Sequence, residues 1–329
     1  MMGDKFSRRE FLRQAVITGA AISGVSAVPA VGKALAAGPS ASGKSRVVKV
    51  TNTASLTDGS YSRTVIDKMV GQGMSRLAGA KSSAAAWKKY FHKNDVVGIK
   101  INCLFGKNAS THPEVVDAVV AGLISAGVKP GNIIIWDRGT GDLAKCGYKI
   151  DKNGGPKCYA NDHEWGDEIT VGSFTGRLTK ILTHDITALV NVPILKTHSI
   201  AGITCALKNH YGSFNNPSQY HEGGCDPYLA DINAAPAIKD KTRLVVVDAI
   251  RPLADGGPGL NKPDALWDCH SILVSADPVA VDYAGWQIVE ERRRQVGLKP
   301  ISQPARWLAS ATSRGLGNSD PAKIEMVSI

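Results

Sequence analysis

The stretch NVPILKTHSIAGITCALKNHYGSF, residues 191–214, carries more basic chemistry than a buried segment usually does. Lys196, His198 and Lys208 are its side chains that could act as acids, bases or electrostatic clamps. Asn209 adds an amide that can donate and accept hydrogen bonds. These residue types predict a site for a small anionic ligand, with Lys196, His198 and Lys208 as the candidate catalytic residues.

A helix over residues 200–212 would divide this stretch into two sides. Its apolar side would bury Tyr211, and its opposite side would turn Lys208 and Asn209 toward the site. His210 lies near the apolar side and is interpreted as a half-buried histidine with satisfied hydrogen bonds. The sequence leaves one alternative open, which is a solvated polar helix face that binds nothing.

Histidine and cysteine side chains in and after this stretch could hold a metal ion. His198, Cys205 and His221 offer the nitrogen and sulfur ligands that zinc and related ions prefer, and Cys225 could join them. Their spacings match no standard zinc pattern, and Cys205 has an alternative role as a small buried thiol. The sequence therefore allows a bound metal or an organic cofactor, but it identifies neither.

The candidate residues must be positioned by strands that precede them in the chain. Apolar runs typical of buried strands occur at residues 47–50, 95–102, 132–137, 188–193, 243–250 and 270–277. Helical patterns lie between several of them, at residues 62–79, 110–127 and 278–297. A strand, a helix and a strand in this order form a unit with parallel strands. The expected fold is therefore a three-layer α/β domain with a mainly parallel central sheet and helices on both faces.

Polar side chains follow the predicted strands. In an open parallel sheet, ligands bind beyond the carboxyl ends of the strands. Besides Asn209, the residues expected to bind substrate or cofactor there are Lys100, Asn102, Asp137, Asp248 and Asp277. Each of these residues could instead be an ordinary turn former or helix cap.

The N-terminal residues resemble a twin-arginine (Tat) export signal of bacteria. Arg8 and Arg9 form the arginine pair in SRREFLRQ, a Gly- and Ala-rich apolar stretch follows, and ALA at residues 34–36 fits a cleavage site. The alternative is a chance arginine pair before an N-terminal helix. The resemblance implies contact with the Tat translocase and a periplasmic or other extracytoplasmic location.

Residues 1–36 are therefore expected to be a signal peptide, and residues 37–329 a single α/β domain with a loop-rich insertion around 139–167. The apolar stretch is too short and too mild for a stable membrane span, so we expect none after cleavage. Removing residues 1–36 lowers the formal net charge from +10 to about +7, since they carry five basic and two acidic side chains. The remaining charges are spread along the chain, which suits an anionic ligand but not nucleic-acid binding.

The chain has six cysteines, at positions 103, 146, 158, 205, 225 and 269. None forms a C-x-x-C pair, so an iron–sulfur cluster is not expected. Disulfides would be allowed in an oxidising compartment. Cys146 and Cys158 are the best candidate pair, because they flank a turn-rich loop that a disulfide would help to order.

Several sequence pieces between residues 95 and 290 resemble the domain-of-unknown-function 362 family, in the order that the family has them. They are VVGIKINC, HPEVVDAVVAGLISAGV, IIIWDRGT, NVPILKTHSIAGITCALKNHYGSF, ADINAAP, LVVVDAI, GGPG and ILVSADPVAVDYAGWQIV. Many members of that family carry a ferredoxin module with clustered cysteines, which this chain lacks. The family has no general assigned reaction.

The segment KTHSIAGITCALKN is also similar in layout to a segment of nickel-pincer lactate racemases. Both contain a basic residue, a histidine, a turn and a lysine in this order. The likeness implies that Lys196, His198 and Lys208 surround an organic or metal-bound cofactor.

The most favoured function is a periplasmic enzyme that binds a small anionic substrate or cofactor at the strand ends through its lysines and histidine. The alternative is a non-catalytic anion- or metal-binding protein of the same compartment, with a chaperone-like role. A purely structural partner in a secreted assembly is a third possibility. The substrate and the reaction are not predicted.

Overall fold

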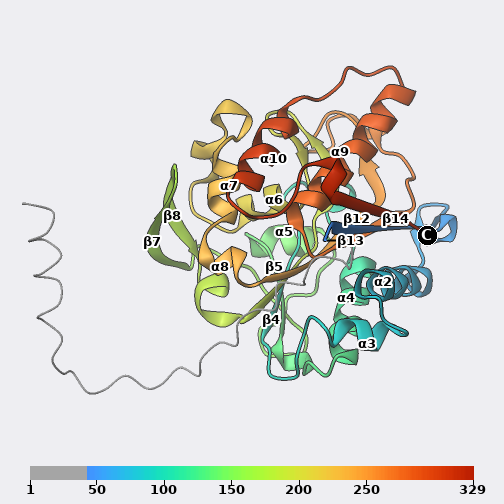
Figure 1. The fold of residues 1–329 in the computed structure, drawn as a ribbon. Coiled ribbons are helices and arrows are strands. Elements are labelled where there is room, and N and C mark those ends of the chain that lie inside the picture. The colour runs from blue at the N-terminus through green and yellow to red at the C-terminus, as the bar shows by residue number, and fades with distance from the viewer. Residues whose placement is uncertain (1–42) are drawn as a thin grey trace, which may run out of the picture. The chain divides into compact units, whose positions relative to one another are not determined.

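A ten-stranded sheet runs through residues 43–329, which are the residues that this computed structural model describes (Figure 1). The expected signal peptide, with Arg8 and Arg9, lies outside the described residues. Eight of the strands follow one another along the sheet, in the order β14 (Ile324–Ser328), β1 (Ser45–Thr51), β13 (Ser271–Ser275), β12 (Thr242–Leu253), β9 (Ala188–Asn191), β4 (Val97–Lys100), β5 (Ile133–Trp136) and β6 (Lys157–Cys158). The other two, β10 (Ile194–His198) and β11 (Gly202–Thr204), extend from β12. On this path, β13 is the one strand that runs antiparallel to its neighbours. The mainly parallel central sheet is therefore confirmed.

Helices cover both faces of the sheet. Side chains alternate between the two faces along each strand, so strands that are apolar throughout present apolar side chains on both faces. In β12, Leu244 and Val246 pack into one core, while Val245 and Val247 pack into the other. The first core is closed by α2 (Arg63–Ala78), α3 (Ser83–Trp87) and α4 (Pro113–Ser125). The second is closed by α6 (Ala206–Asn209), α7 (Tyr228–Asn233), α9 (Pro278–Gln295) and α10 (Gln303–Ser313). Figure 1 shows these two sets of helices on opposite sides of the sheet, which confirms the three layers.

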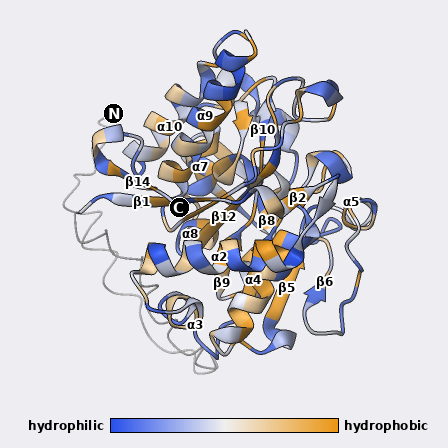
Figure 2. Cartoon of the chain, turned by 90° about the vertical axis from the view of Figure 1, so that its right-hand side faces the viewer, coloured by the Kyte–Doolittle hydropathy of each residue, from blue (hydrophilic) through white to orange (hydrophobic). Residues whose placement is uncertain are grey.

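The long helices form where the sequence pattern predicts them. In α4, Val115, Val119 and Leu123 recur every fourth residue and are fully buried, and Figure 2 shows hydrophobic colour on α4 and on β5. Pro113 stands in the first turn of α4, where its missing N–H costs no hydrogen bond. These helices fix the strands beneath them and thereby the strand ends.

The remaining elements are short. Two antiparallel ribbons are formed by β2 (Leu56–Thr57) with β3 (Ser60–Tyr61) and by β7 (Trp165–Val171) with β8 (Phe174–Thr179). The stretch around 139–167 contains α5 (Thr140–Lys145) and β6, and β6 adds a strand to the central sheet beside β5. Helix α8 (Pro236–Lys239) leads into β12. No helix within residues 43–329 combines the length and the apolar character that a membrane crossing needs.

The predicted helix over residues 200–212 is wrong in its first half. The chain instead forms β10 (Ile194–His198), which pairs with β12, and then turns back into β11 (Gly202–Thr204). Gly202 has a φ of +85°, a left-handed conformation that glycine adopts without strain, and the hairpin pairs Lys196 with Thr204. Helix α6 begins only at Ala206. The hairpin therefore fixes Lys196 and His198 on a strand.

The prediction that all strand ends meet at one edge is wrong for β13. Because β13 runs antiparallel to β12, its carboxyl end lies at the opposite edge of the sheet. Asp277, which follows β13, is therefore not at the predicted site. Its carboxylate begins α9 instead, accepting the backbone N–H groups of Val279 and Ala280 at 2.8 and 2.8 Å.

Candidate functional site

A cavity of about 350 Å³ lies at the carboxyl ends of β4, β5 and β10, between these strand ends and α6. The sequence-predicted residues that line it are Lys100, Asn102, Asp137, Lys196, His198, Lys208, Asn209 and His221. They come from segments far apart in the chain, and the parallel strand order brings them together.

Two further predicted residues lie elsewhere. Asp248 is fully buried in the middle of β12, where it accepts the His112 backbone N–H at 2.9 Å and lies 2.6 Å from His112 Nδ1. Cys205 is also fully buried and lies against Asp282 of α9. Assigning Asp248 to the ligand and Cys205 to a metal was therefore wrong, because both side chains belong to the packing of the core.

Lys100 and Asp137 form a buried ion pair at the floor of the cavity. Lys100 Nζ lies 2.7 Å from Asp137 Oδ1, and it also donates to the Ile101 carbonyl at 2.6 Å. The other carboxylate oxygen of Asp137 accepts the Cys103 backbone N–H at 2.6 Å. A Cβ at Gly212 would lie 2.8 Å from Asp137 Oδ1, so only glycine lets the backbone pass this pair so closely. The positive charge of Lys100 is therefore balanced within the protein.

Lys196 has no such counter-charge. Its Nζ donates to the Ala109 carbonyl at 2.6 Å and lies 5.1 Å from the centre of the Phe105 ring. Within residues 43–329, no carboxylate lies within ion-pair distance of it. Burial lowers the pKa of Lys196 to about 7, against the weaker opposing attraction of Asp137. The ammonium is therefore costly to maintain in the free protein.

Lys208 also lacks a carboxylate partner in the described part of the chain, and its ammonium group faces a histidine. Its Nζ lies 3.2 Å from His221 Nε2 and 3.1 Å from the centre of the Tyr211 ring. Burial lowers the pKa of Lys208 to about 7, and burial together with the nearby Lys208 charge lowers the pKa of His221. His221 is therefore the weaker base of the two and can accept a hydrogen bond from a protonated Lys208.

His198 is held in one tautomer. Its Nδ1 accepts the backbone N–H groups of Ile200 and Ala201 at 3.1 and 3.2 Å, so the ring proton must sit on Nε2. Burial and the nearby Lys208 charge lower the pKa of His198 to about 2. The ring stacks on that of His221 with centroids 5.7 Å apart. His198 is therefore a neutral hydrogen-bond donor.

Amide side chains line the wall next to Lys100. Asn209 accepts from Asn102 Nδ2 at 3.2 Å and donates to Asn191 Oδ1 at 2.7 Å. The Asn102 Oδ1 atom is shielded from solvent and has no hydrogen-bond partner within the described chain. A ligand donor would satisfy it. His210 lies outside the cavity, fully buried between Asn191 and Ser213.

The histidines alone do not make a metal site. In the part of the chain that the structure describes, no group of three or more His, Cys, Asp or Glu side chains is placed to hold a metal ion. His198 and His221 face each other, but the predicted third ligand, Cys205, lies in the core. The donor set therefore fits an anion better than a metal ion.

Several cavity residues were not found from the sequence. Tyr211 is buried in the core as predicted, but its ring also lines the cavity under Lys208. The rim contains Leu104, Phe105 and Ile200, which are 47%, 43% and 42% exposed. The pair LF directly after the strand-end residues 100–103 was the one signal that pointed to this rim. The cavity thus has two unpaired lysines inside and an apolar entrance.

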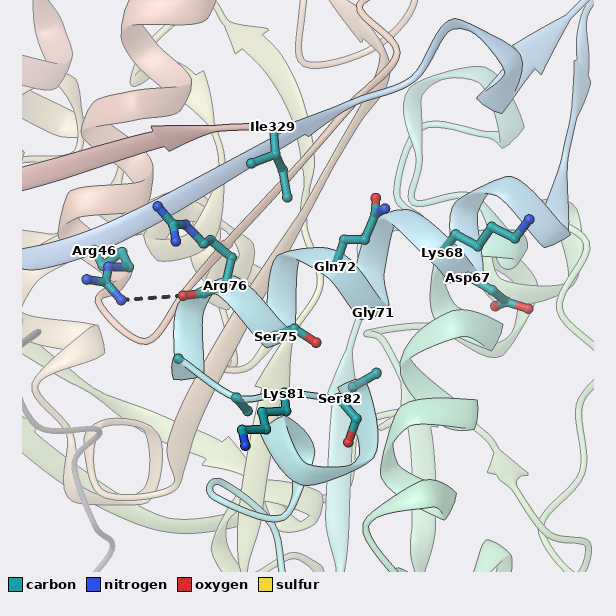
Figure 3. A pocket seen from close by; sticks show the side chains of 13 residues that line it. Arg46, Asp67, Lys68, Gly71, Gln72, Ser75, Arg76, Lys81, Ser82 and Ile329 are labelled. Carbon is teal, nitrogen blue, oxygen red and sulfur yellow. Dashed lines mark hydrogen bonds between the residues drawn. The ribbon is translucent and has the colours of Figure 1, made fainter.

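A larger groove of about 1000 Å³ lies along α2, and Figure 3 shows its lining. The Arg46 guanidinium at one end donates to the Arg76 carbonyl at 3.4 Å. Lys68, Lys81 and Gln72 are exposed, and water screens the charges of the two lysines. This groove does not lie at the strand ends and has no buried, uncompensated charge.

The six cysteines are free thiols in the structure, so the predicted Cys146–Cys158 disulfide is not present. Cys158 lies in β6 and pairs through its backbone with Asp151. Cys146, at the end of α5, lies against Cys103 instead, and its Sγ is 3.4 Å from the Cys103 carbonyl oxygen.

Comparison of the sequence with known families gives a match to the part of the chain that forms the site. The family described as a domain of unknown function (DUF362) matches residues 97–287. Every residue that lines the cavity falls within this range. No curated protein matches the chain.

Comparison with solved structures finds a protein of Thermotoga maritima, known from a crystal structure, that is similar to this chain. The similarity covers 72% of this chain and 60% of the other, with 10% sequence identity and a TM-score of 0.41. This chain thus spans about three fifths of that protein's length.

Proposed function

The chain belongs to the DUF362 family, and we propose that it is an exported enzyme that binds a small anionic substrate and transfers a proton to or from it. The substrate would occupy the cavity formed by Lys196, His198 and Lys208. Export through the Tat pathway, supported by the sequence around Arg8 and Arg9, would place this activity outside the cytoplasm.

One observation carries the proposal, which is the presence of two buried lysines without counter-charges in one cavity. Lys196 and Lys208 are 1% and 5% exposed. A buried ammonium without a carboxylate partner is unfavourable, and a ligand of negative charge would remove that penalty. Lys100 needs no ligand, because Asp137 already balances its charge. The cavity therefore suits a carboxylate or another small anion.

Each side chain then has a role that follows from its protonation. Protonated Lys196 binds the anionic group of the substrate. Asn102 Oδ1 accepts a hydrogen bond from an O–H or N–H group elsewhere in the substrate. The pKa of about 7 leaves a fraction of Lys208 neutral near pH 7, and this neutral form is the general base; the adjacent His221 accepts a hydrogen bond from the ammonium that results. His198 donates its Nε2 proton in a hydrogen bond to a substrate oxygen on which negative charge develops.

Solvent hydrogen exchange tests this assignment without knowledge of the natural substrate. The mature protein is incubated in D₂O with lactate, malate or pyruvate, and the loss of carbon-bound hydrogen is followed by ¹H NMR. We expect exchange with at least one acid, its loss in Lys208→Met, and normal exchange in Lys129→Met, an exposed lysine. Neither variant should melt at a lower temperature than the wild type.

Three results would count against the assignment. Exchange that persists in Lys208→Met would remove this lysine as the base. A variant that unfolds would show Lys208 to be structural. Anion binding without exchange of any of the acids would assign the cavity to the alternative function, a non-catalytic anion-binding protein.

A further inference from the structure

Two buried thiols lie directly behind the rim of the cavity. Cys103 follows Asn102 at the end of β4, and Cys146 ends α5; both are 1% exposed. Cys146 Sγ lies 3.4 Å from the Cys103 carbonyl oxygen, and each thiol is near enough to shift the pKa of the other. The described chain brings no other two cysteines into such contact.

The two thiols differ in acidity. Hydrogen bonds from Cys103 and Ser110 lower the pKa of the Cys146 thiol to about 7, although burial opposes this. Burial raises the pKa of the Cys103 thiol above its usual range. A thiol with a pKa near the ambient pH attacks disulfides most readily, so Cys146 suits the role of the attacking sulfur.

We propose that Cys103 and Cys146 form a thiol–disulfide exchange site, which closes to a disulfide when an oxidised dithiol or a small disulfide supplies the oxidant. The Cys146 thiolate attacks one sulfur of the external disulfide, whose S–S bond breaks and releases one thiolate. Cys103 then gives its proton to the thiolate released in the first step, attacks the Cys146 sulfur of the mixed disulfide and displaces the second thiolate. Two electrons pass to the external disulfide, and the two protein protons end on the released thiols.

The disulfide would act on the cavity through the loop that it anchors. Cys103 is followed by Leu104 and Phe105, which form the exposed rim, and the Phe105 ring lies over Lys196. The Cys103 backbone N–H also holds Asp137. Joining Cys103 to Cys146 ties this loop to α5, so the oxidised form holds the rim over the cavity and the reduced form releases it.

Burial of both thiols sets a condition on the exchange. External disulfides reach Cys146 only when the rim segment opens, and the exposure of Leu104 and Phe105 makes this the accessible side. Cys158 and Cys225 are matched controls, because each is buried but lies against a different part of the fold.

Mass spectrometry tests the linkage. The mature protein is equilibrated with reduced and oxidised dithiothreitol, its free thiols are alkylated in denaturant, and its peptides are mapped. We expect a mass lower by two hydrogen atoms in the oxidised protein and a peptide that links Cys103 to Cys146. Cys103→Ala and Cys146→Ala should each lose this peptide, whereas Cys158→Ala and Cys225→Ala should keep it. A linkage to Cys158, or no disulfide even at the most oxidising ratio, overturns the proposal.

Hydrogen–deuterium exchange tests the effect on the rim and requires no ligand. In the oxidised wild type, amide exchange over residues 103–111 should slow by about tenfold or more relative to the reduced form. The same comparison in Cys146→Ala should show no change, and circular dichroism checks that this variant is folded. Equal exchange in both forms of a wild type shown to be oxidised would refute the coupling to the cavity. Neither experiment depends on the proposed catalytic function.

Discussion

At the scale of single residues, the site is defined by how three buried lysines are balanced. Lys100 has Asp137 at 2.7 Å, whereas Lys196 and Lys208 have only a carbonyl, a histidine and aromatic rings nearby. An aromatic face supports a cation but does not neutralise it. The free protein is therefore left with an electrostatic penalty that a bound anion would relieve.

The depressed lysine pKa values predict that anion binding weakens as the pH rises. An anion favours the protonated lysines, so it raises the pKa of Lys196 and Lys208 above the value of about 7 in the free protein. Below pH 7 both are already protonated and affinity is full. Above pH 7 it should fall by up to about tenfold per pH unit for each lysine, until the pKa of the bound form is reached.

Calorimetry with oxalate, which stays a dianion over this range, measures the effect. Titrations in buffers of different ionisation enthalpy should also show proton uptake on binding. An affinity that does not change with pH would contradict the assignment of these lysines.

Replacing Lys196 by methionine should stabilise the free protein at pH 7. The change removes a buried charge but keeps most of the side-chain volume, so the free energy of unfolding should rise by about 1–3 kcal/mol. The increase in the free energy of unfolding should become smaller as the pH approaches 10. Because the native pKa is about 7 and the usual value is 10.5, the penalty is full below pH 7 and fades as the pH rises to the unfolded value.

Urea denaturation at the two pH values measures this difference. Lys129→Met, at an exposed position, should change stability by less than about 0.5 kcal/mol. Destabilisation by Lys196→Met at pH 7 would mean that the lysine has a structural role.

At the scale of elements, the site depends on a short helix held by a long one. Helix α6 has four residues and could not form alone. Asp282 of α9 holds its start, accepting the backbone N–H groups of Ala206 and Leu207 at 2.6 and 3.0 Å. Lys208 and Asn209 follow directly, so Asp282 is a positioning residue for the cavity.

Removing the Asp282 carboxylate should therefore impair both stability and ligand binding. Asp282→Ala leaves two buried N–H groups without partners and should cost about 2–4 kcal/mol, while Asp282→Asn keeps one acceptor and should cost roughly half as much. Oxalate affinity, measured by calorimetry well below the melting temperature, should fall in both variants. Unchanged affinity in a folded Asp282→Ala would show that α6 does not need this support.

The strands and long helices could be predicted because each has a local signal. Apolar runs at residues 95–102 and 132–137 and the capped helix from Pro278 became elements close to the expected places. The hairpin of β10 and β11 could not be predicted from spacing, since ILKTHSIAGIT suits a helix start as well as a turn with Gly202. An apolar run does not indicate whether its strand is parallel or antiparallel to its neighbours. The sequence therefore predicts the wrong edge of the sheet for Asp277, which follows the antiparallel β13.

Much of the candidate site could be predicted for the same reason. Lys100, Asn102 and Asp137 follow parallel strands and do line the cavity. Asp248 could not be excluded, because β12 continues to Leu253 and buries this residue in mid-strand. Which lysine has a counter-charge also could not be predicted, because Lys100 and the Asp137 that pairs with it are 37 positions apart in the chain.

In the whole molecule, one hydrophobic core packs against each face of the sheet, and the carboxyl ends of the parallel strands remain available to form the cavity. All of the cavity lies within the family match at residues 97–287, whereas β1 and β14 add strands outside it. The residues that form the site thus all come from the matched region. Under the proposed function, the N-terminal residues direct export.

Export should depend on the arginine pair. Arg8→Lys/Arg9→Lys should abolish accumulation outside the cytoplasm in a Tat-competent bacterium, since the translocase recognises the pair. Cell fractionation and immunoblotting measure this, and a host that lacks the Tat translocase should retain the wild type in the same way. Export of the doubly substituted chain would refute the Tat assignment.

We propose that Lys196 and Lys208 together bind a small anion. Calorimetric titration of the mature protein with oxalate, pyruvate and phosphate at pH 6.5 tests it most directly. The wild type and an exposed control, Lys88→Met/Lys129→Met, should bind at least one of them with equal affinity, and Lys196→Met/Lys208→Met should remain folded and bind none. The claim is contradicted if no anion binds to the wild type, or if the folded double variant in the cavity binds as tightly as the control.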